Sequence, residues 1–331
     1  MSTRILIITD NLQDQVNGVV TTFKNLNQVG SRNGYDLVYI SPRDFPHTST
    51  PRYPEVKISW PKGIGALIEK IKPSHIHIAT EGPIGLAGRL YCDRKGYKYN
   101  TSYHTKFPEF MKEIYHVPMF LTYAYLRWFH KHSGRVLTTT KTMVQELQEH
   151  GFKGDIIPWT RGVDRDQFFP MKHRRQKDKP VLVCVSRVSK EKGLDDFCSM
   201  DVDAYKVVVG DGPYLSELKR KYPDVEFTGM RKGAGLAESY MNADVFVFPS
   251  RTDTFGIVII EALACGTPVA AYPVPGPIDI LENGVTGYME ENLVSAVNKA
   301  LLLDREVVYA NSLEWTWERC WKIFKENLIA K

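Results

Sequence analysis

Short apolar runs alternate along the chain with stretches in which apolar residues recur every three or four positions. Such alternation is typical of a parallel β-sheet covered by helices on both faces. In the first half, six runs predict buried strands, at residues 4–10, 36–41, 75–80, 97–104, 135–140 and 155–160. Residues 21–34 and 140–151 predict helices between strands, and Gly151 marks the end of the second.

A second series of strands follows an interruption at residues 164–180, where five of the ten residues from Met171 to Pro180 are Lys or Arg. We interpret this interruption as a solvated connector between domains. Beyond it, strands are predicted at residues 181–187, 205–212, 225–229, 245–250 and 267–274. The fold class is therefore α/β, with two Rossmann-like, doubly wound parallel-sheet domains, and ligands are expected in a cleft at the carboxyl ends of the strands.

Near the end of the chain, residues 312–329 predict an amphipathic helix. Trp317, Cys320, Trp321 and Phe324 fall on one stripe of this helix. A stripe of this kind is typical of a packing face, and we expect it to be buried.

Composition narrows the class of protein only slightly. The 331 residues include 43 Lys and Arg against 38 Asp and Glu, which gives a net charge of +5 that mildly favours anionic ligands without requiring nucleic acid. The five cysteines lack metal-ligand spacing and predict reduced thiols (Cys92, Cys184, Cys198, Cys265 and Cys320). A strand predicted within the first four residues leaves no room for a signal peptide, and no apolar run reaches membrane-spanning length, so a cytoplasmic location is expected.

Two acids lie close to a long apolar run in the stretch SRTDTFGIVIIEALACGTPVA, residues 250–270. We predict a loop and then a helix that begins near Thr254–Phe255 and ends at Gly266. Asp253 in the loop could accept sugar hydroxyls, and Glu261, two turns into the helix, could accept both hydroxyls of a ribose. The local alternative is a helix N-cap at Asp253 and an exposed acid at Glu261.

Other polar residues also follow predicted strands. Arg187 and Lys192 could converge on a diphosphate, although a solvated loop is an equal alternative. Asn17-Gly18 precedes a helix that begins near Val19, where the backbone could approach an anion or simply turn. A lone histidine such as His104 is more often structural than catalytic.

Taken in order, these motifs resemble the retaining, nucleotide-sugar-dependent glycosyltransferases of family four, which have the GT-B fold. The matching segments are IATEGPIG, SYHTKFPEF, RGVDRDQFFP, SRVSKEKG, VGDGP and TDTFGIVIIEALACGTPVAAYPVPGP, at residues 78–85, 102–110, 161–170, 186–193, 209–213 and 252–277. HTKFPE and TDTFG are most similar to the branch of lipid α-mannosyltransferases and sulfoquinovosyl-diacylglycerol synthase, in which the acidic motif begins with Asp, as at Asp253.

This resemblance implies a hexosyltransferase that uses a UDP- or GDP-linked sugar. It implies catalytic roles for His104, Asp253, Arg187 and Lys192, with Glu261 on the ribose and the nucleobase near Gly229–Arg231. The implied donor-binding residues are Asn17, Gly18, Arg187, Lys192, Gly229, Met230, Arg231, Asp253, Thr254, Phe255, Gly256, Ile257 and Glu261. The cations and helix N-termini would stabilise the leaving diphosphate, so no metal and no cofactor beyond the donor is expected.

The resemblance also implies that the terminal helix crosses back to the first domain. The expected domains are therefore residues 1–165 with 312–331, on the acceptor side, and residues 166–311, on the donor side. We expect a lipid or glycan acceptor near residues 80–85, 104–110 and 113–135. The last stretch could make a peripheral contact to the inner membrane face or grip nucleic acid, although a core helix with one wet face is the favoured interpretation. Two alternatives stay open: a viral-type enzyme that glucosylates a hydroxymethylated DNA base, and a nucleotide-sugar epimerase or binding protein.

Overall fold

The computed structural model describes residues 2–15, 17–50, 57–171 and 177–331, and the chain folds into two compact units. The first unit comprises Met1–Arg161 and Trp317–Lys331, and the second comprises Gly162–Thr316. These boundaries lie a few residues from those expected at 165 and 312. The assignment of donor and acceptor sides to the two units stays a prediction.

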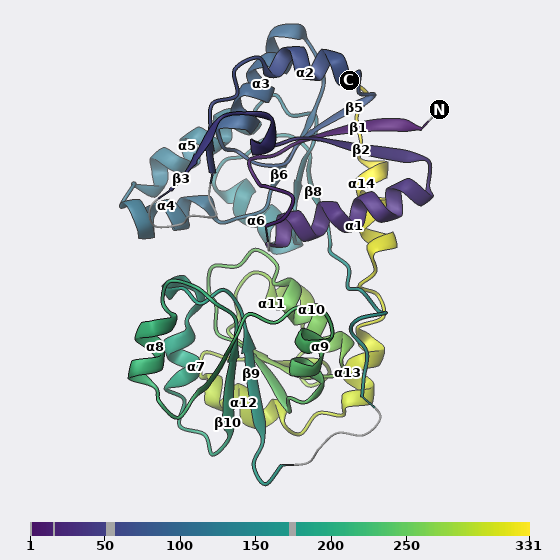
Figure 1. The fold of residues 1–331 in the computed structure, drawn as a ribbon. Helices are drawn as coiled ribbons and strands as arrows, with labels where there is room; N and C mark the ends of the chain where they lie inside the picture. Colours follow the sequence, from purple (N-terminus) through teal and green to yellow (C-terminus); the bar gives the residue numbers. More distant parts are fainter. Residues whose placement is uncertain (1, 16, 51–56, 172–176) are drawn as a thin grey trace. The chain divides into compact units, whose positions relative to one another are not determined.

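The first unit is built on a six-stranded parallel sheet in the order β2-β1-β5-β6-β7-β8 (Figure 1). Its strands are β1 Thr3–Ile8, β2 Tyr35–Ile40, β5 His75–Ile78, β6 Asn100–Tyr103, β7 Val136–Thr138 and β8 Ile156–Pro158, with a separate antiparallel pair, β3 His47–Ser49 and β4 Lys57–Ser59. Its helices are α1 Gly18–Arg32, α2 Ile64–Ile71, α3 Pro83–Lys95, α4 Phe107–Tyr115, α5 Met119–His130, α6 Lys141–Glu149 and α14 Trp317–Glu326, with a 3₁₀ turn η1 at Pro42–Asp44.

The second unit repeats this plan with the strand order β11-β10-β9-β12-β13-β14, again all parallel. Its strands are β9 Val181–Val185, β10 Tyr205–Val209, β11 Glu226–Gly229, β12 Val245–Phe248, β13 Val269–Ala271 and β14 Gly287–Met289. Its helices are α7 Leu194–Cys198, α8 Leu215–Lys221, α9 Gly233–Met241, α10 Ile257–Ala264, α11 Pro277–Ile280, α12 Leu293–Ala300 and α13 Arg305–Asn311, with a 3₁₀ turn η2 at Lys190–Lys192.

Both faces of each sheet are buried, which explains the continuous apolar runs in the sequence. In β1, Ile5 and Ile7 pack into one cluster with residues of α1 and α14, whereas Leu6 and Ile8 pack on the opposite face with α2 and α3. Side chains of a strand alternate between its two faces, so a strand covered on both sides has no polar face. The α/β fold with two Rossmann-like sheets is thus confirmed.

The terminal helix α14 lies against α1 in the first unit (Figure 1). Trp317, Cys320, Trp321 and Phe324 are all buried, as the stripe predicted. A Cβ on Gly30 of α1 would lie 2.9 Å from the Trp321 ring, so the close approach of the two helices requires a glycine there. The helix itself begins at Trp317 rather than at 312, because residues 305–311 form the separate helix α13.

Three expectations about local structure were wrong in detail. The polar residues that follow the strands lie in loops, so most strands end one to three residues before their expected ends. Residues 113–135 hold the end of α4 and all of α5 rather than one helix, with Pro118 at the start of the second. The first part of the expected connector is not solvated: Phe168 is buried against Tyr240, while residues 172–176 lie outside the described part.

All five cysteines are buried and carry free thiols. Burial raises their pKa values, to about 12 for Cys92, Cys198, Cys265 and Cys320 and further for Cys184. Within the described segments, no helix has both the length and the apolarity that crossing a bilayer requires.

Candidate active site

The candidate donor site lies where the chain reverses direction across the second sheet. From β9 the chain runs to β10 and β11 on one side and then crosses to β12 on the other. The connections that follow β9 and β12 therefore run in opposite directions across the sheet, and the carboxyl edge at such a point is where ligands bind in open α/β sheets. Arg187 and Lys192 follow β9, and Asp253 follows β12, so the fold brings together cations and an acid from two separate motifs.

Lys192 and Asp253 form an ion pair at this edge, with 2.7 Å between Nζ and Oδ1. Their side chains are only 21% and 25% exposed, so solvent screens the pair incompletely. Burial alone would raise the pKa of Asp253, but the charge of Lys192 and hydrogen bonds from Lys192 and Ser250 lower it below its ordinary value. Asp253 is therefore an anion at neutral pH, and its alternative role as a helix N-cap is excluded because Gly256 holds that position.

Two further contacts hold the loop that carries Asp253 against the loop that carries Lys192. The Thr252 hydroxyl donates to the Glu191 carbonyl at 3.3 Å. A Cβ on Gly193 would lie 2.4 Å from the Pro249 carbonyl oxygen, so the two backbones are in close contact. These contacts hold the two loops together beside the charged pair.

Helix α10 begins at Ile257, not near Thr254–Phe255 as expected. The reason is Gly256, whose φ of +88° belongs to the left-handed region and breaks the helical path. The backbones of Thr254 and Phe255 therefore belong to the buried loop, whereas Ile257 provides the first helical N–H.

Glu261 lies in the second turn of α10 and is not an exposed acid. Its Oε2 accepts a hydrogen bond of 2.9 Å from the hydroxyl of Tyr240, which is completely buried in α9. Burial raises the pKa of Glu261 to about 7, although the Tyr240 bond opposes that rise. The carboxylate is therefore oriented by a tyrosine 21 residues away in the sequence, which no local pattern could indicate.

The pKa of Glu261 gives a testable pH dependence for donor affinity. A ribose diol needs the ionised carboxylate as its acceptor, so the Kd of a nucleotide sugar should rise ~10-fold as the pH is lowered from about 8 to about 6. Tyr240→Phe should shift this profile to higher pH, because the hydrogen bond that lowers the pKa is lost. Calorimetric titration with an intact nucleotide sugar is the measurement, since a free nucleoside diphosphate has a terminal phosphate that titrates near pH ~6.

Two control variants accompany this titration. Glu261→Gln should bind weakly and without the pH dependence, and Tyr205→Phe, at an exposed tyrosine of β10, should keep the native profile. A native Kd that is constant over this pH range would contradict the assignment of Glu261 to the ribose.

The expected nucleobase region lies at the end of β11. Gly229 ends this strand in the left-handed region, Met230 is 54% exposed, and Arg231 donates to the Ser239 hydroxyl at 3.2 Å. The backbone here is accessible at the same carboxyl edge as the charged pair.

In the first unit, the corresponding switch point between β1 and β5 is closed by Asp10. Its carboxylate accepts from Thr80 and from the backbone N–H groups of Ile84 and Gly85 at the start of α3. Burial raises its pKa above the ordinary value despite these bonds. The N-terminus of α3 is thus already occupied by a carboxyl group of the chain itself, whereas α1, which follows β1, starts at the same switch point.

The start of α1 has the form expected from the Asn17-Gly18 pair. Asn17 is the N-cap and accepts a hydrogen bond of 2.9 Å from the Val20 N–H, and Gly18 is the first helical residue and is exposed. The backbone at Gly18 is therefore accessible to a ligand.

His104 follows β6, beside α1 and the end of β8. Its ring lies edge-on to Phe23, with 6.1 Å between centroids, and is tilted against Trp159 at 5.7 Å. Arg161 donates to its Nδ1 at 2.9 Å. Burial, and then the charges of Arg161 and His77, lower its pKa well below the ordinary value, so His104 is neutral.

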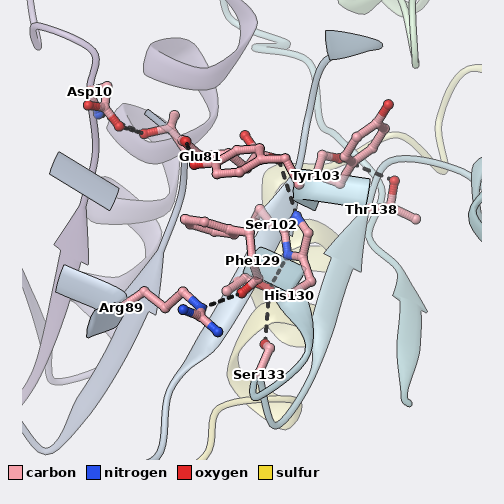
Figure 2. A network of polar contacts seen from close by, with 12 residues as sticks. Asp10, Glu81, Arg89, Ser102, Tyr103, Phe129, His130, Ser133 and Thr138 are labelled. Carbon is pink, nitrogen blue, oxygen red and sulfur yellow. Dashed lines mark hydrogen bonds and ion pairs between the residues drawn. The ribbon is translucent and has the colours of Figure 1, made fainter. Parts of the chain in front are cut away.

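A buried polar network connects residues 80–85, between β5 and the start of α3, to α5 (Figure 2). Glu81 Oε1 lies 3.4 Å from His130 Nε2, and His130 Nδ1 lies 2.7 Å from the Thr101 hydroxyl. Arg89 donates to the Phe129 carbonyl and holds the end of α5. Sequence reasoning missed this network and the contacts of Asp10, Tyr240 and Arg161, because each joins residues far apart in the chain.

The two parallel Rossmann-like sheets have the architecture of the GT-B fold. The model of Glycosyltransferase Family 4 matches residues 16–167, and the model of Glycosyl transferases group 1 matches residues 165–304. The chain belongs to this family of glycosyltransferases, which confirms the resemblance and the enzyme class predicted from the motifs.

Similar proteins agree with this membership. The GDP-mannose-dependent alpha-mannosyltransferase of Corynebacterium glutamicum is 29% identical over 315 residues, covering 86% of this chain and 76% of that protein. The alpha-monoglucosyldiacylglycerol synthase of Streptococcus pneumoniae is 26% identical over 351 residues, covering 90% and 78%. The solved structure of sucrose-phosphate synthase from Thermosynechococcus elongatus has a TM-score of 0.81 at 17% identity, covering 98% of each chain, and shows the shared fold.

Proposed function

We propose that this glycosyltransferase moves a hexose from a GDP- or UDP-linked sugar to a hydroxyl of a lipid or glycan acceptor, with retention at the anomeric carbon. The observation that carries the proposal is the Lys192–Asp253 ion pair at the switch point of the second sheet. A single edge there offers a cation for phosphate and a fixed carboxylate for sugar hydroxyls.

On the donor side, Glu261 holds the ribose, Asp253 holds hydroxyls of the sugar, and Arg187 and Lys192 hold the diphosphate. The name of the mannosyltransferase relative supports GDP-mannose as a first donor to test. Both cations lie in a loop that backbone hydrogen bonds hold in place. The two side chains therefore need to move little when charge develops on the diphosphate.

The chemistry follows from these charges. The bond between the anomeric carbon and the phosphate oxygen breaks, the diphosphate keeps the electron pair, and Arg187 and Lys192 stabilise the new charge. The acceptor oxygen forms its bond to the anomeric carbon on the same face of the sugar, and the proton of the acceptor hydroxyl passes to the departing diphosphate. A metal is not part of this proposal, and activity after treatment with a chelator checks that expectation.

A lipid acceptor is favoured by the surface of α5. Phe120, Leu121 and Trp128 are 69%, 51% and 44% exposed and lie on one face of the helix, next to the basic residues Arg127 and Lys131. Aromatic and aliphatic side chains beside basic ones are typical of helices that lie in a membrane interface. The name of the diacylglycerol-modifying relative supports the same class of acceptor, and neither relative is named for DNA.

A panel of nucleotide sugars incubated with lipid vesicles, oligosaccharides and hydroxymethylcytosine DNA tests the proposal. Mass spectrometry should find a hexose-sized mass increase on the lipid or the glycan, and the anomeric configuration in the product should equal that of the donor. Asp253→Asn should abolish the product, and Asp178→Asn, at an exposed aspartate before β9, should not.

Two outcomes would contradict the proposal. An epimerised donor without any transfer would indicate the epimerase alternative. Transfer to the DNA alone, lost steeply as salt is raised, would indicate a nucleic-acid acceptor.

A further inference from the structure

Arg161 is a buried cation in the segment that follows β8, in the first unit. It is 3% exposed, and its Nη1 donates to the carbonyls of Trp159 at 2.6 Å and Thr160 at 2.9 Å. Its guanidinium lies over the Trp159 ring, 4.5 Å from the centroid. Among the described residues, no carboxylate forms an ion pair with it. The plane and direction of this cation are therefore fixed by backbone and ring contacts.

The remaining terminal nitrogen of Arg161, Nη2, is directed at His104 Nδ1, 2.9 Å away. A guanidinium nitrogen donates hydrogen bonds and cannot accept them. Nδ1 must therefore carry the lone pair, and the ring proton of a neutral His104 must be on Nε2. Burial lowers the pKa of Arg161 to about 10, which still leaves it charged at neutral pH.

From this geometry we infer that Arg161 is a positioning residue, which holds His104 as a neutral imidazole with an Nε2–H donor. The titratable groups that face His104 are Arg161 and His77, and the other rings against it are those of Phe23 and Trp159. Burial, and then the charges of both neighbours, disfavour the imidazolium, so His104 stays neutral over the neutral range, and the Arg161 contact keeps its proton on Nε2.

The inference rests on the proposed function for its catalytic meaning. With the Nδ1 lone pair occupied by Arg161 and a proton on Nε2, His104 cannot take a proton from the acceptor hydroxyl. It can donate a hydrogen bond to the oxygen that joins the donor sugar to the diphosphate, and that bond strengthens as this oxygen takes on the negative charge of the leaving group. Arg161 thus has the reverse effect of the carboxylate that orients a basic histidine in hydrolases.

Nitrogen NMR of the histidine rings in the full chain tests the tautomer directly. The chain has nine histidines, and the signal of His104 is identified by its loss in His104→Gln. The native protein should show His104 as the Nε2–H tautomer between about pH 6 and about pH 8. A protonated Nδ1, or an imidazolium at about pH 7, would overturn the inference, and this test needs no variant of Arg161.

Two variants then separate positioning from mere structure. Arg161→Gln should lower kcat about 10- to 100-fold but should change the KM for the donor less than about threefold. In this variant His104 should show a mixture of the two tautomers. Arg161→Lys keeps an N–H donor and should retain the Nε2–H tautomer and more of the activity. Unchanged kcat and tautomer in Arg161→Gln would overturn the inference, whereas the expected tautomer without any transfer activity would reject only the proposed function.

Discussion

Glu261→Ala is expected to weaken the binding of the nucleotide sugar at least ~100-fold, because two ribose hydroxyls lose a charged acceptor and each such bond contributes about 1.5–3 kcal/mol. The carboxylate is held by the buried Tyr240 hydroxyl, so the native protein presents it in one orientation before the donor arrives. Calorimetric titration near pH ~8, where the carboxylate is ionised, measures the effect at its largest.

The matched control for this variant is Glu217→Ala, which removes an exposed carboxylate from α8 of the same unit. It should leave the donor Kd unchanged. Thermal unfolding provides a second measurement, since the donor should stabilise the native and control proteins but not Glu261→Ala. If Glu261→Ala keeps both donor affinity and activity, the assignment of the ribose site is wrong.

The second large effect is expected for His104→Ala. This variant should lower kcat about 10²- to 10³-fold, whereas the donor Kd should change less than about threefold. A hydrogen bond that strengthens as charge develops contributes to turnover much more than to binding of the ground state. Steady-state kinetics at saturating donor, together with calorimetric titration, separates the two quantities.

The control is His47→Ala, which removes an exposed histidine of β3 and should leave kcat unchanged. His104→Gln keeps an N–H donor and should recover part of the lost kcat. Equal losses in donor affinity and in turnover would show that His104 contributes uniform binding instead.

The sequence predicts the two sheets well because the physical signal for them is local. Strands such as β9 and β12 are buried on both faces, so each appears as an uninterrupted apolar run followed by a polar loop. The carboxyl ends of parallel strands share one edge, so Lys192 and Asp253 could be placed near each other without coordinates.

The contacts that orient the candidate residues are not local and could not be predicted. Tyr240 meets Glu261 across two helices, and Arg161, which follows β8, meets His104, which follows β6, two strands earlier in the chain. The start of α10 was misplaced for a different reason: an apolar sequence such as TFGIVII does not reveal that Gly256 adopts a left-handed conformation. Pairings of this kind depend on how elements pack, which periodicity does not encode.

The burial of all five cysteines has a practical consequence. Thiolate is the form that reacts with maleimides and iodoacetamides, and burial keeps these thiols protonated and inaccessible. A single cysteine introduced at an exposed position in each unit would therefore be labelled while the five native cysteines stay unreacted. A pair of fluorophores attached in this way would report, in real time, how the distance between the units responds to a nucleotide sugar.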